Sequence, residues 1–456
     1  MRWPPYLGLP ILWLYLGPPI FRPIGGRDAM ASLEGQFDVW NVMRLGWWAV
    51  FGVLAAIMIY RNQHLVRAFV RTMPQLLLWI LVWMSSLVVS SAYSPSPLFT
   101  LANAGMMVML VTAAFDVGLR LYGRIIDVET VLRGLHVFSV ALLGVMLLLF
   151  ALDPMWVSTF SPRFGLRFGG GVVGDAALLA STVVFLSAYF LQRVPRRRMW
   201  WYGTTGVVGI VLVLLSQTRT AYIGLAVGFV YMFVQWYISA SDRARAVAVG
   251  IVLVGVGLAP VAVLVADTVS GESTPAQAVR YLVRDQQTLA TASGRTAVAG
   301  ILLEQVGARP WGLGYSAGPR ILLQTSFSEL AEQGVHAEGI GNAHNIFLEV
   351  LGGSGVLGLF AYVAVIVWVV LNMHRGGGPV LVVRVLFVYV MIIGMTSSNG
   401  VLPFFQASVL MWFMVGSVAG LNGLGHVVPT VRAPWSVQPA PDVPALLGSG
   451  ERSVRQ

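Results

Sequence analysis

Long apolar runs separated by short polar segments extend over most of the chain. A helix needs about 20 apolar residues to cross the hydrocarbon core of a bilayer. The pattern therefore predicts an all-α polytopic membrane protein with about twelve transmembrane helices. The expected spans are 6–21, 45–60, 74–92, 98–118, 135–152, 172–191, 199–215, 221–238, 246–266, 346–372, 380–397 and 404–421.

The spans form one expected transmembrane domain over 1–426, because no internal repeat divides them. The first span is not followed by a small-residue cleavage site, so we expect a retained helix rather than a signal peptide. Repeated prolines in 427–456 predict a disordered cytoplasmic tail.

One polar connection, 267–343, is far longer than the others. Long ordered loops often carry function. A threonine followed by proline predicts a helix over 274–289. A second helix is expected over 293–306, ending before Pro310, and the glycine-rich segment 312–318 is expected to be irregular. The sequence thus predicts a partly helical loop.

Composition supports the membrane assignment and excludes several kinds of chemistry. Of 456 residues, 57% are hydrophobic and 11% are charged, against about 25% charged in a soluble domain. There are no cysteines, which excludes thiolate nucleophiles and cysteine-ligated metals. No lysine occurs among the 29 cationic residues. A Schiff-base lysine and a phosphate-loop lysine are therefore excluded.

The arginines are unevenly divided between the two sets of loops that the spans define. Arginine collects in cytoplasmic loops, which orients the chain with both termini inside and the long loop outside. The cytoplasmic set is Arg61, Arg67, Arg71, Arg120, Arg124, Arg133, Arg193, Arg196, Arg197, Arg198, Arg243, Arg245, Arg375 and Arg384. The short outer loops hold fewer arginines, among them Arg27, Arg44, Arg163, Arg167 and Arg219.

The stretch 336–358 runs from a polar, glycine-broken segment into an apolar span. His344 and Asn345 stand at that junction, where ionisable groups are uncommon and tend to be functional. A histidine titrates near neutral pH, so His344 could act as a general base, donate a hydrogen bond, or simply occupy the interface. Glu349 lies inside the span and is expected to pair with an outer arginine. Glycines at every third position from 352 to 358 are assigned to helix packing.

Several outer arginines are candidates for binding an anion. Arg219 follows a span almost without a loop, and it either marks a site or snorkels to a lipid headgroup. Arg295 falls in the first turn of the second loop helix, where a bound anion would offset its repulsion from the helix dipole. A solvated loop charge is the plain alternative. Arg280 and Arg284 share a helix face and repel each other unless an anion lies between them.

The sequence predicts no metal site and no cofactor. The nearest approach to an Asp-x-Asp motif, Asp127 and Glu129, falls on the cytoplasmic side. His336 and His344 do not have metal-ligand spacing. No Gly-x-Ser-x-Gly elbow of a hydrolase is present. We expect membrane lipids as partners, and no nucleic acid.

Taken together, these segments resemble the O-antigen ligase and O-antigen polymerase superfamily of bacterial envelope glycosyltransferases. The resemblance rests on three segments in order. They are 216–220, then 293–295 with the Pro-Trp-Gly-Leu-Gly run at 310–314, and finally His344-Asn345 followed by Gly355 and Gly358. In ligases the next position is Gly, Thr or Tyr, but here it is Leu359, so ligase and polymerase both stay open.

The resemblance implies a multi-span glycosyltransferase of the C type, at the bacterial inner membrane with its site on the periplasmic face. The donor would be a glycan on undecaprenyl diphosphate. The acceptor would be lipid A-core or a second lipid-linked glycan, in lipopolysaccharide or other polysaccharide biosynthesis. Transfer would be inverting and metal-independent. Arg219 and Arg295 would hold the diphosphate, and His344 would lie near the acceptor hydroxyl.

The alternative from another class is a transporter or flippase for lipid-linked oligosaccharides. A transporter is expected to place ionisable groups near the middle of the membrane, between two related halves. In this sequence the candidate charges gather at one membrane edge and no halves match, which favours the transferase.

Overall fold

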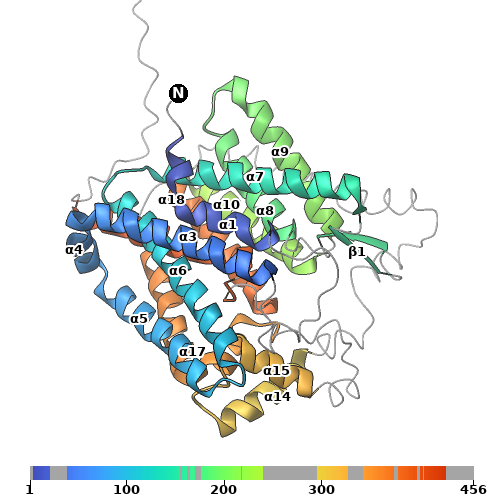
Figure 1. The fold of residues 1–456 in the computed structure, drawn as a ribbon. Helices are drawn as coiled ribbons and strands as arrows, with labels where there is room; N and C mark the ends of the chain where they lie inside the picture. The colour runs from blue at the N-terminus through green and yellow to red at the C-terminus, as the bar shows by residue number, and fades with distance from the viewer. Residues whose placement is uncertain are drawn as a thin grey trace, which may run out of the picture.

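A computed structural model describes residues 4–20, 39–154, 157–161, 165–169, 176–216, 218–239, 295–326, 343–373, 378–397, 401–403 and 405–427. Within these residues, long helices pack side by side in a bundle, and two shorter helices, α14 and α15, lie together at one end of it (Figure 1). The apolar runs form helices because in lipid every backbone polar group must be satisfied within its own segment.

The helices follow the predicted order along the chain. They are α1 (Pro10–Ile20), α3 (Val39–Arg61), α4 (Gln63–Thr72), α5 (Pro74–Val89), α6 (Pro97–Tyr122), α7 (Val128–Leu152), α8 (Ala176–Leu191), α9 (Arg196–Ser216), α10 (Arg219–Ser239), α14 (Arg295–Ala308), α15 (Ala317–Thr325), α17 (Ile346–Asn372), α18 (Gly378–Thr396) and α19 (Gln406–Val427). Two short 3-10 helices are η1 (Pro5–Gly8) and η2 (Ser90–Tyr93).

Seven helices of the described part are long and apolar enough to cross a membrane. These candidate spans are 41–61, 74–93, 97–122, 128–152, 196–216, 346–372 and 378–395. The prediction of a helical multi-pass membrane protein is therefore confirmed. The total of twelve spans stays a prediction, because the expected span 246–266 lies outside the described residues.

Two elements differ from the sequence predictions. A short antiparallel hairpin, β1 (Ser158–Ser161) with β2 (Gly165–Phe168), occupies the connection before α8, which was expected to be a plain loop. The connection after α3, also expected to be a loop, forms the helix α4. Its ten residues are too few to cross a membrane, and it packs on the bundle through the fully buried Phe69. Neither element has the apolar length that revealed the spans.

Close helix packing at the centre of the bundle depends on small residues. Every residue of α19 from 406 to 420 is buried. A side chain at Gly416 would overlap the carbonyl of Ala114 in α6, and one at Gly420 would lie 2.6 Å from the carbonyl oxygen of Gly118. Small residues four apart on both helices allow this approach, which in lipid supplies much of the attraction between helices.

The bundle has two ends, because successive spans alternate in direction. One end, called here the arginine-rich end, contains the starts of α7 and α9. There the Arg133 guanidinium lies 5.9 Å from the centre of the Phe190 ring near the end of α8, and Arg193 approaches Gly378 at the start of α18. The opposite end, where α17 begins, is called the His344 end.

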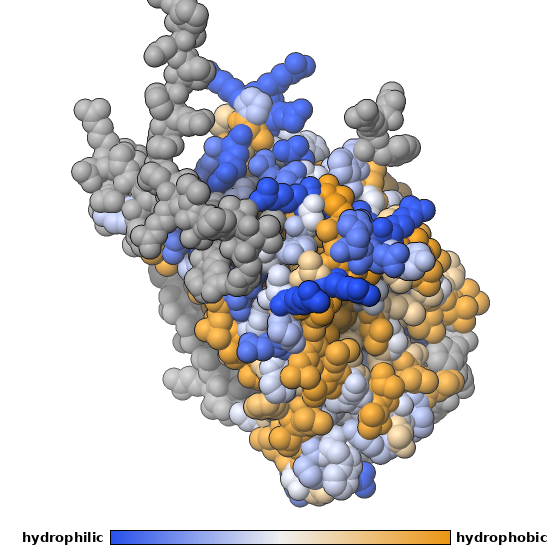
Figure 2. Space-filling model, turned by 90° about the vertical axis from the view of Figure 1, so that its left-hand side faces the viewer, coloured by the Kyte–Doolittle hydropathy of each residue, from blue (hydrophilic) through white to orange (hydrophobic). Residues whose placement is uncertain are grey.

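Figure 2 shows hydrophilic side chains gathered mostly towards the top of one face, above a largely hydrophobic surface.

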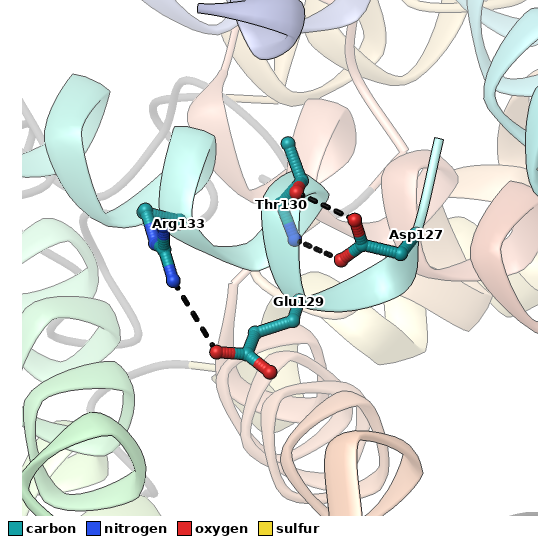
Figure 3. Close-up of polar contacts among 4 residues, drawn as sticks. All are labelled: Asp127, Glu129, Thr130 and Arg133. Carbon is teal, nitrogen blue, oxygen red and sulfur yellow. Dashed lines mark hydrogen bonds and ion pairs between the residues drawn. The ribbon is translucent and has the colours of Figure 1, made fainter. Parts of the chain in front are cut away.

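The start of α7 shows that the acidic pair considered as a metal motif has local structural roles (Figure 3). The Asp127 carboxylate accepts hydrogen bonds of 2.7 Å from the backbone N–H and the hydroxyl of Thr130, and so caps the helix. Glu129 pairs with Arg133 at 3.3 Å, one turn along the same helix. Both side chains of this pair are 39% exposed.

Candidate functional site

The helix α17 is broken near its beginning, and a loop docks into the break. Gly355 has φ +71°, outside the helical region. The carbonyls freed by this break accept hydrogen bonds from the loop: Leu313 N–H donates to Gly352 at 2.7 Å, and Gly314 N–H donates to Gly353 at 3.0 Å. In return, Val356 N–H donates to the Pro310 carbonyl at 2.8 Å. The loop therefore satisfies the backbone groups that the break exposes.

This arrangement refines two sequence predictions. The segment 312–318 is irregular as expected, with φ of +95° at Gly312 and +106° at Gly314. The glycines of α17 do serve packing, but Gly355 and Gly358 pack against different kinds of neighbour. A side chain at Gly355 would overlap the backbone of Trp311, so the partner there is the loop rather than another helix. Gly358 does face a helix, because an added Cβ would lie 3.0 Å from the Ser86 hydroxyl of α5.

The docked loop is also tied to the connection between α5 and α6. The Tyr93 hydroxyl donates to the Trp311 carbonyl at 2.6 Å. The backbone N–H of Tyr315 donates to the Ser90 hydroxyl at 2.9 Å, and the Tyr315 side chain is fully buried with its hydroxyl on the Val401 carbonyl. Burial raises the pKa of Tyr315 well above its usual range, so the phenol stays neutral. The loop is thus fixed on several sides.

His344 and Asn345 occupy the turn that opens α17. The Asn345 side-chain oxygen accepts hydrogen bonds from the N–H groups of Phe347 (2.9 Å) and Leu348 (3.2 Å), which caps the helix. Its amide nitrogen donates to the Met395 carbonyl of α18 at 3.1 Å. Asn345 therefore fixes the start of α17 against the end of α18, a structural role that the sequence did not reveal.

His344 adopts a strained backbone conformation. Its φ is +51°, and it is one of three non-glycine residues with positive φ in the described part of the chain. Left-handed conformations are uncommon for residues other than glycine, although histidine adopts them more often than most residues do. Such strain costs about 1–3 kcal/mol and persists where surrounding contacts impose it, often at functional sites. The His344 side chain is half-buried.

A buried carboxylate lies directly behind His344. Glu349 is 1% exposed, and its Oε2 accepts a 3.0 Å hydrogen bond from the backbone N–H of Ala343. Arg320 of α15 lies near enough for its charge to interact with that of Glu349. Burial lowers the pKa of Arg320, and the Glu349 carboxylate opposes this shift, so the guanidinium stays charged. Arg320, which the sequence did not single out, therefore supplies a positive charge near Glu349.

The start of α14 lies beside the same turn. Val298 and Leu302, in the first two turns of α14, form a buried apolar cluster with Leu323 and Ala343. Arg295 is the first residue of this helix, one turn before Val298. The sequence predicted a helix over 293–306, and the observed bounds agree within two residues. The first turns of α14 and the turn before α17 thus contribute to one apolar cluster, although they are far apart in the sequence.

The start of α10 reaches the same end of the bundle. Gly224 packs against the ring of Tyr389, and Gly228 against Val385, so α10 and α18 are antiparallel. The same register puts Arg219, the first residue of α10, level with Gly394. Because an added Cβ at Gly394 would lie 2.5 Å from the Ile346 side chain, this level is also the beginning of α17.

Three predicted positions therefore share the His344 end: the starts of α10 and α14, and the turn before α17. Two helix N-termini directed at one region favour an anion there, because the first-turn N–H groups and the helix dipoles attract negative charge. Arg280 and Arg284 lie outside the described residues. Within the described ranges no cluster of three His, Asp or Glu could hold a metal ion, and metal independence stays a prediction.

The model of a protein family described as O-antigen ligase matches residues 204–363. A comparison with curated proteins found no match. The matched segment begins inside α9 and includes the starts of α10, α14 and α17 together with the break in α17. It thereby contains Arg219, Arg295, His344 and the break in α17, and it supports a transferase of the ligase or polymerase type in cell-envelope polysaccharide assembly. The match over residues 204–363 therefore supports the resemblance of this chain to the O-antigen ligase and O-antigen polymerase superfamily.

Proposed function

We propose that this protein transfers a glycan from undecaprenyl diphosphate to a sugar hydroxyl of an envelope acceptor. The acceptor is lipid A-core, as for an O-antigen ligase, or a second lipid-linked glycan, as for a polymerase. The reaction takes place at the His344 end, on the periplasmic face of the inner membrane. It inverts the anomeric carbon and needs no metal. In this proposal 1–426 is one twelve-span domain, and 427–456 is a tail without a part in transfer.

The diphosphate is held by Arg219 and Arg295. Each is the first residue of a helix at the His344 end, so guanidinium and first-turn N–H groups bind the same oxygens. As the bond between the anomeric carbon and the diphosphate breaks, its electron pair leaves with the diphosphate. Positive groups fixed beforehand at a water-poor membrane edge stabilise that developing charge. Arg280 and Arg284 add further positive charge in the same loop.

The acceptor sugar attacks through a hydroxyl oxygen, which forms the new bond to the anomeric carbon. The hydroxyl proton passes to the imidazole of His344 late in the attack, when the oxygen has become acidic. His344 also directs the hydroxyl, because its strained backbone fixes where the ring can lie. Asn345 and Glu349 do not contact substrate in this scheme; they hold the turn through the hydrogen bonds to Phe347 and Ala343.

The observation that carries the proposal is the meeting of three helix starts at one end of the bundle. Arg219, Arg295 and His344 come from segments widely separated in the chain, and the match to the O-antigen ligase family covers all three. A structural scaffold would have no need to bring two arginines and a strained histidine to one membrane edge.

Reconstitution tests the proposal directly. The purified protein is placed in vesicles with an undecaprenyl-diphosphate glycan and either lipid A-core or excess donor as acceptor. A product in which glycan is attached to lipid A-core identifies a ligase, and a ladder of longer donor-linked chains identifies a polymerase. If neither product forms and the donor instead crosses the bilayer, the proposal is wrong and the protein is a transporter.

A further inference from the structure

An open groove lies along the side of α9 that faces away from the bundle. It has no part in the proposed transfer. It has a volume of about 560 Å³, within the range of small-ligand sites. Arg196 lines it at the start of α9, and Trp200, Gly203, Thr204 and Val207 line it along the helix. From 196 to 208 the lined part of α9 is roughly 18 Å long. The groove thus has one cationic end and an extended apolar body.

The groove faces away from the protein. The opposite side of α9 packs against α8, where an added Cβ at Gly209 would lie 2.8 Å from Val184 and one at Gly206 would lie 3.2 Å from Ser187. On the groove side, Trp200 is 82% exposed and Val207 is 61% exposed. Because α9 is one of the candidate membrane spans, this exposed apolar surface is expected to contact lipid chains.

The cationic end has no neutralising partner within the described part of the protein. Arg196, Arg197 and Arg198 form the first turn of α9, which contains no acidic residue. None of the three forms an ion pair with a described carboxylate. Three cations at a helix start also oppose the helix dipole. An anion bound at this end would relieve both penalties, and an apolar chain attached to it would fill the groove.

We propose that this groove binds an anionic glycerophospholipid, with its phosphate on Arg196 and an acyl chain along Gly203 and Val207. Arginine suits a phosphate because its planar guanidinium offers two parallel N–H donors. The bound lipid belongs to the leaflet opposite the transfer site. Arg196 starts the 21-residue helix whose other end adjoins Arg219, and 21 residues span roughly 30 Å, the thickness of the hydrocarbon core. The site is therefore distinct from the one proposed for the donor.

Gly203 offers a specific way to block the groove. An added Cβ at this position meets nothing within 4 Å, so a leucine there would enter the groove without disturbing the bundle. Thr204, also exposed, gives a second blocking position. Arg67, on α4, is an exposed arginine outside the groove and serves as the matched control for charge.

Native mass spectrometry of the full chain in detergent measures the binding. The probes are phosphatidylglycerol and phosphatidylcholine. We expect phosphatidylglycerol to bind at least about tenfold more tightly, because the choline cation of phosphatidylcholine is repelled by the three arginines at the start of α9 and cancels the charge of the phosphate. Arg196→Gln and Gly203→Leu should each weaken phosphatidylglycerol binding about tenfold, a change of about 1.4 kcal/mol, and Arg67→Gln should leave it unchanged.

Three results would overturn the proposal. If Arg67→Gln weakened phosphatidylglycerol binding as much as Arg196→Gln does, only general surface charge would attract the lipid. Equal binding of phosphatidylcholine would show that the groove does not select a lipid with a net negative charge. Retained binding in a folded Gly203→Leu protein would show that the groove is not used. If that variant does not fold, Thr204→Trp replaces it, with the same expected loss and the same contrary result.

Discussion

The helices α7 and α17 begin with the same three devices, but at opposite ends of the bundle. Each has an Asx cap, a glutamate in its first turn and an arginine that interacts with that glutamate. In α7 the pair, Glu129 with Arg133, is 39% exposed and lies within one helix. In α17 the glutamate is 1% exposed, and its arginine, Arg320, comes from another helix.

The difference shows how burial changes what a shared local pattern does. An exposed pair contributes little to stability because water solvates and screens both charges. A buried pair is costly to form, and it is strongly destabilising to break, since a lone charge is left behind. Glu129 of α7 therefore only interacts within its own helix. Glu349 of α17, in contrast, links the turn that contains His344 to the neighbouring helix α15.

The largest expected effect is from removing the buried acid. Glu349→Ala leaves Arg320 without its opposing charge and frees the Ala343 N–H. We expect a loss of about 3–5 kcal/mol in stability and a lower transfer rate. The matched change Glu129→Ala should cost less than about 1 kcal/mol. Thermal unfolding of both variants in the same detergent measures the contrast, and equal losses would contradict the account.

A second effect concerns the break in α17. Gly355→Ala puts a Cβ against Trp311 at a residue with φ +71°. Strain and overpacking should together cost roughly 1–3 kcal/mol and displace the docked loop. The control is Gly144→Ala in α7, where an added Cβ meets nothing within 4 Å and the helix is regular. Unfolding midpoints should fall only for Gly355→Ala; an unchanged midpoint in that variant would mean that the loop does not occupy the break.

Removing the cap of α17 and removing the cap of α7 should cause losses of stability that differ less. Asn345→Ala removes the cap of α17 and the bond to Met395, with an expected cost of about 1–2 kcal/mol. Asp127→Ala removes only a cap, with an expected cost of about 1 kcal/mol. Transfer measurements separate them further, because only Asn345→Ala should slow the reaction. A comparable loss of transfer in Asp127→Ala would show that the effect is general destabilisation.

The smallest effect is a dependence on pH. Burial raises the pKa of Asp127, but hydrogen bonds from Thr130 lower it more, and the net pKa is below the usual value. Stability from this cap is therefore present above the unfolded pKa of about 4 and is lost as pH falls through the folded pKa. Asn345 does not titrate. The stability difference between wild type and Asp127→Asn should shrink below about pH 4. Unfolding at several pH values measures this difference. A difference that grows on acidification would contradict the prediction.

Much of the fold could be predicted from the sequence, because apolar length decides where a chain can cross lipid. The helix α14 was also predictable, since Ser293 precedes it in the sequence and Pro310 follows its end. The hairpin β1–β2 and α4 were missed because their signals are short and local. The break in α17 was missed because glycines permit both close packing and positive φ, and only the docked loop decides between them.

The candidate site was predictable in its residue types but not in its supports. His344 stood out as an ionisable group at a membrane edge. Glu349 called for a cation, yet several arginines in the outer loop could have supplied it. The choice of Arg320 depends on how α15 packs against α17, which no short pattern encodes. Tyr315, buried behind the loop, likewise gave no signal in the sequence.

The most direct measurement is the single-turnover rate of glycan transfer from undecaprenyl diphosphate by the reconstituted protein. Wild type is compared with Arg219→Ala, Arg295→Ala and His344→Ala, and with Arg67→Gln as a control at the other end of the bundle. The account predicts losses on the order of a hundredfold for the first three variants and none for the control, with unfolding midpoints unchanged. Full transfer by folded Arg219→Ala and His344→Ala proteins would contradict it.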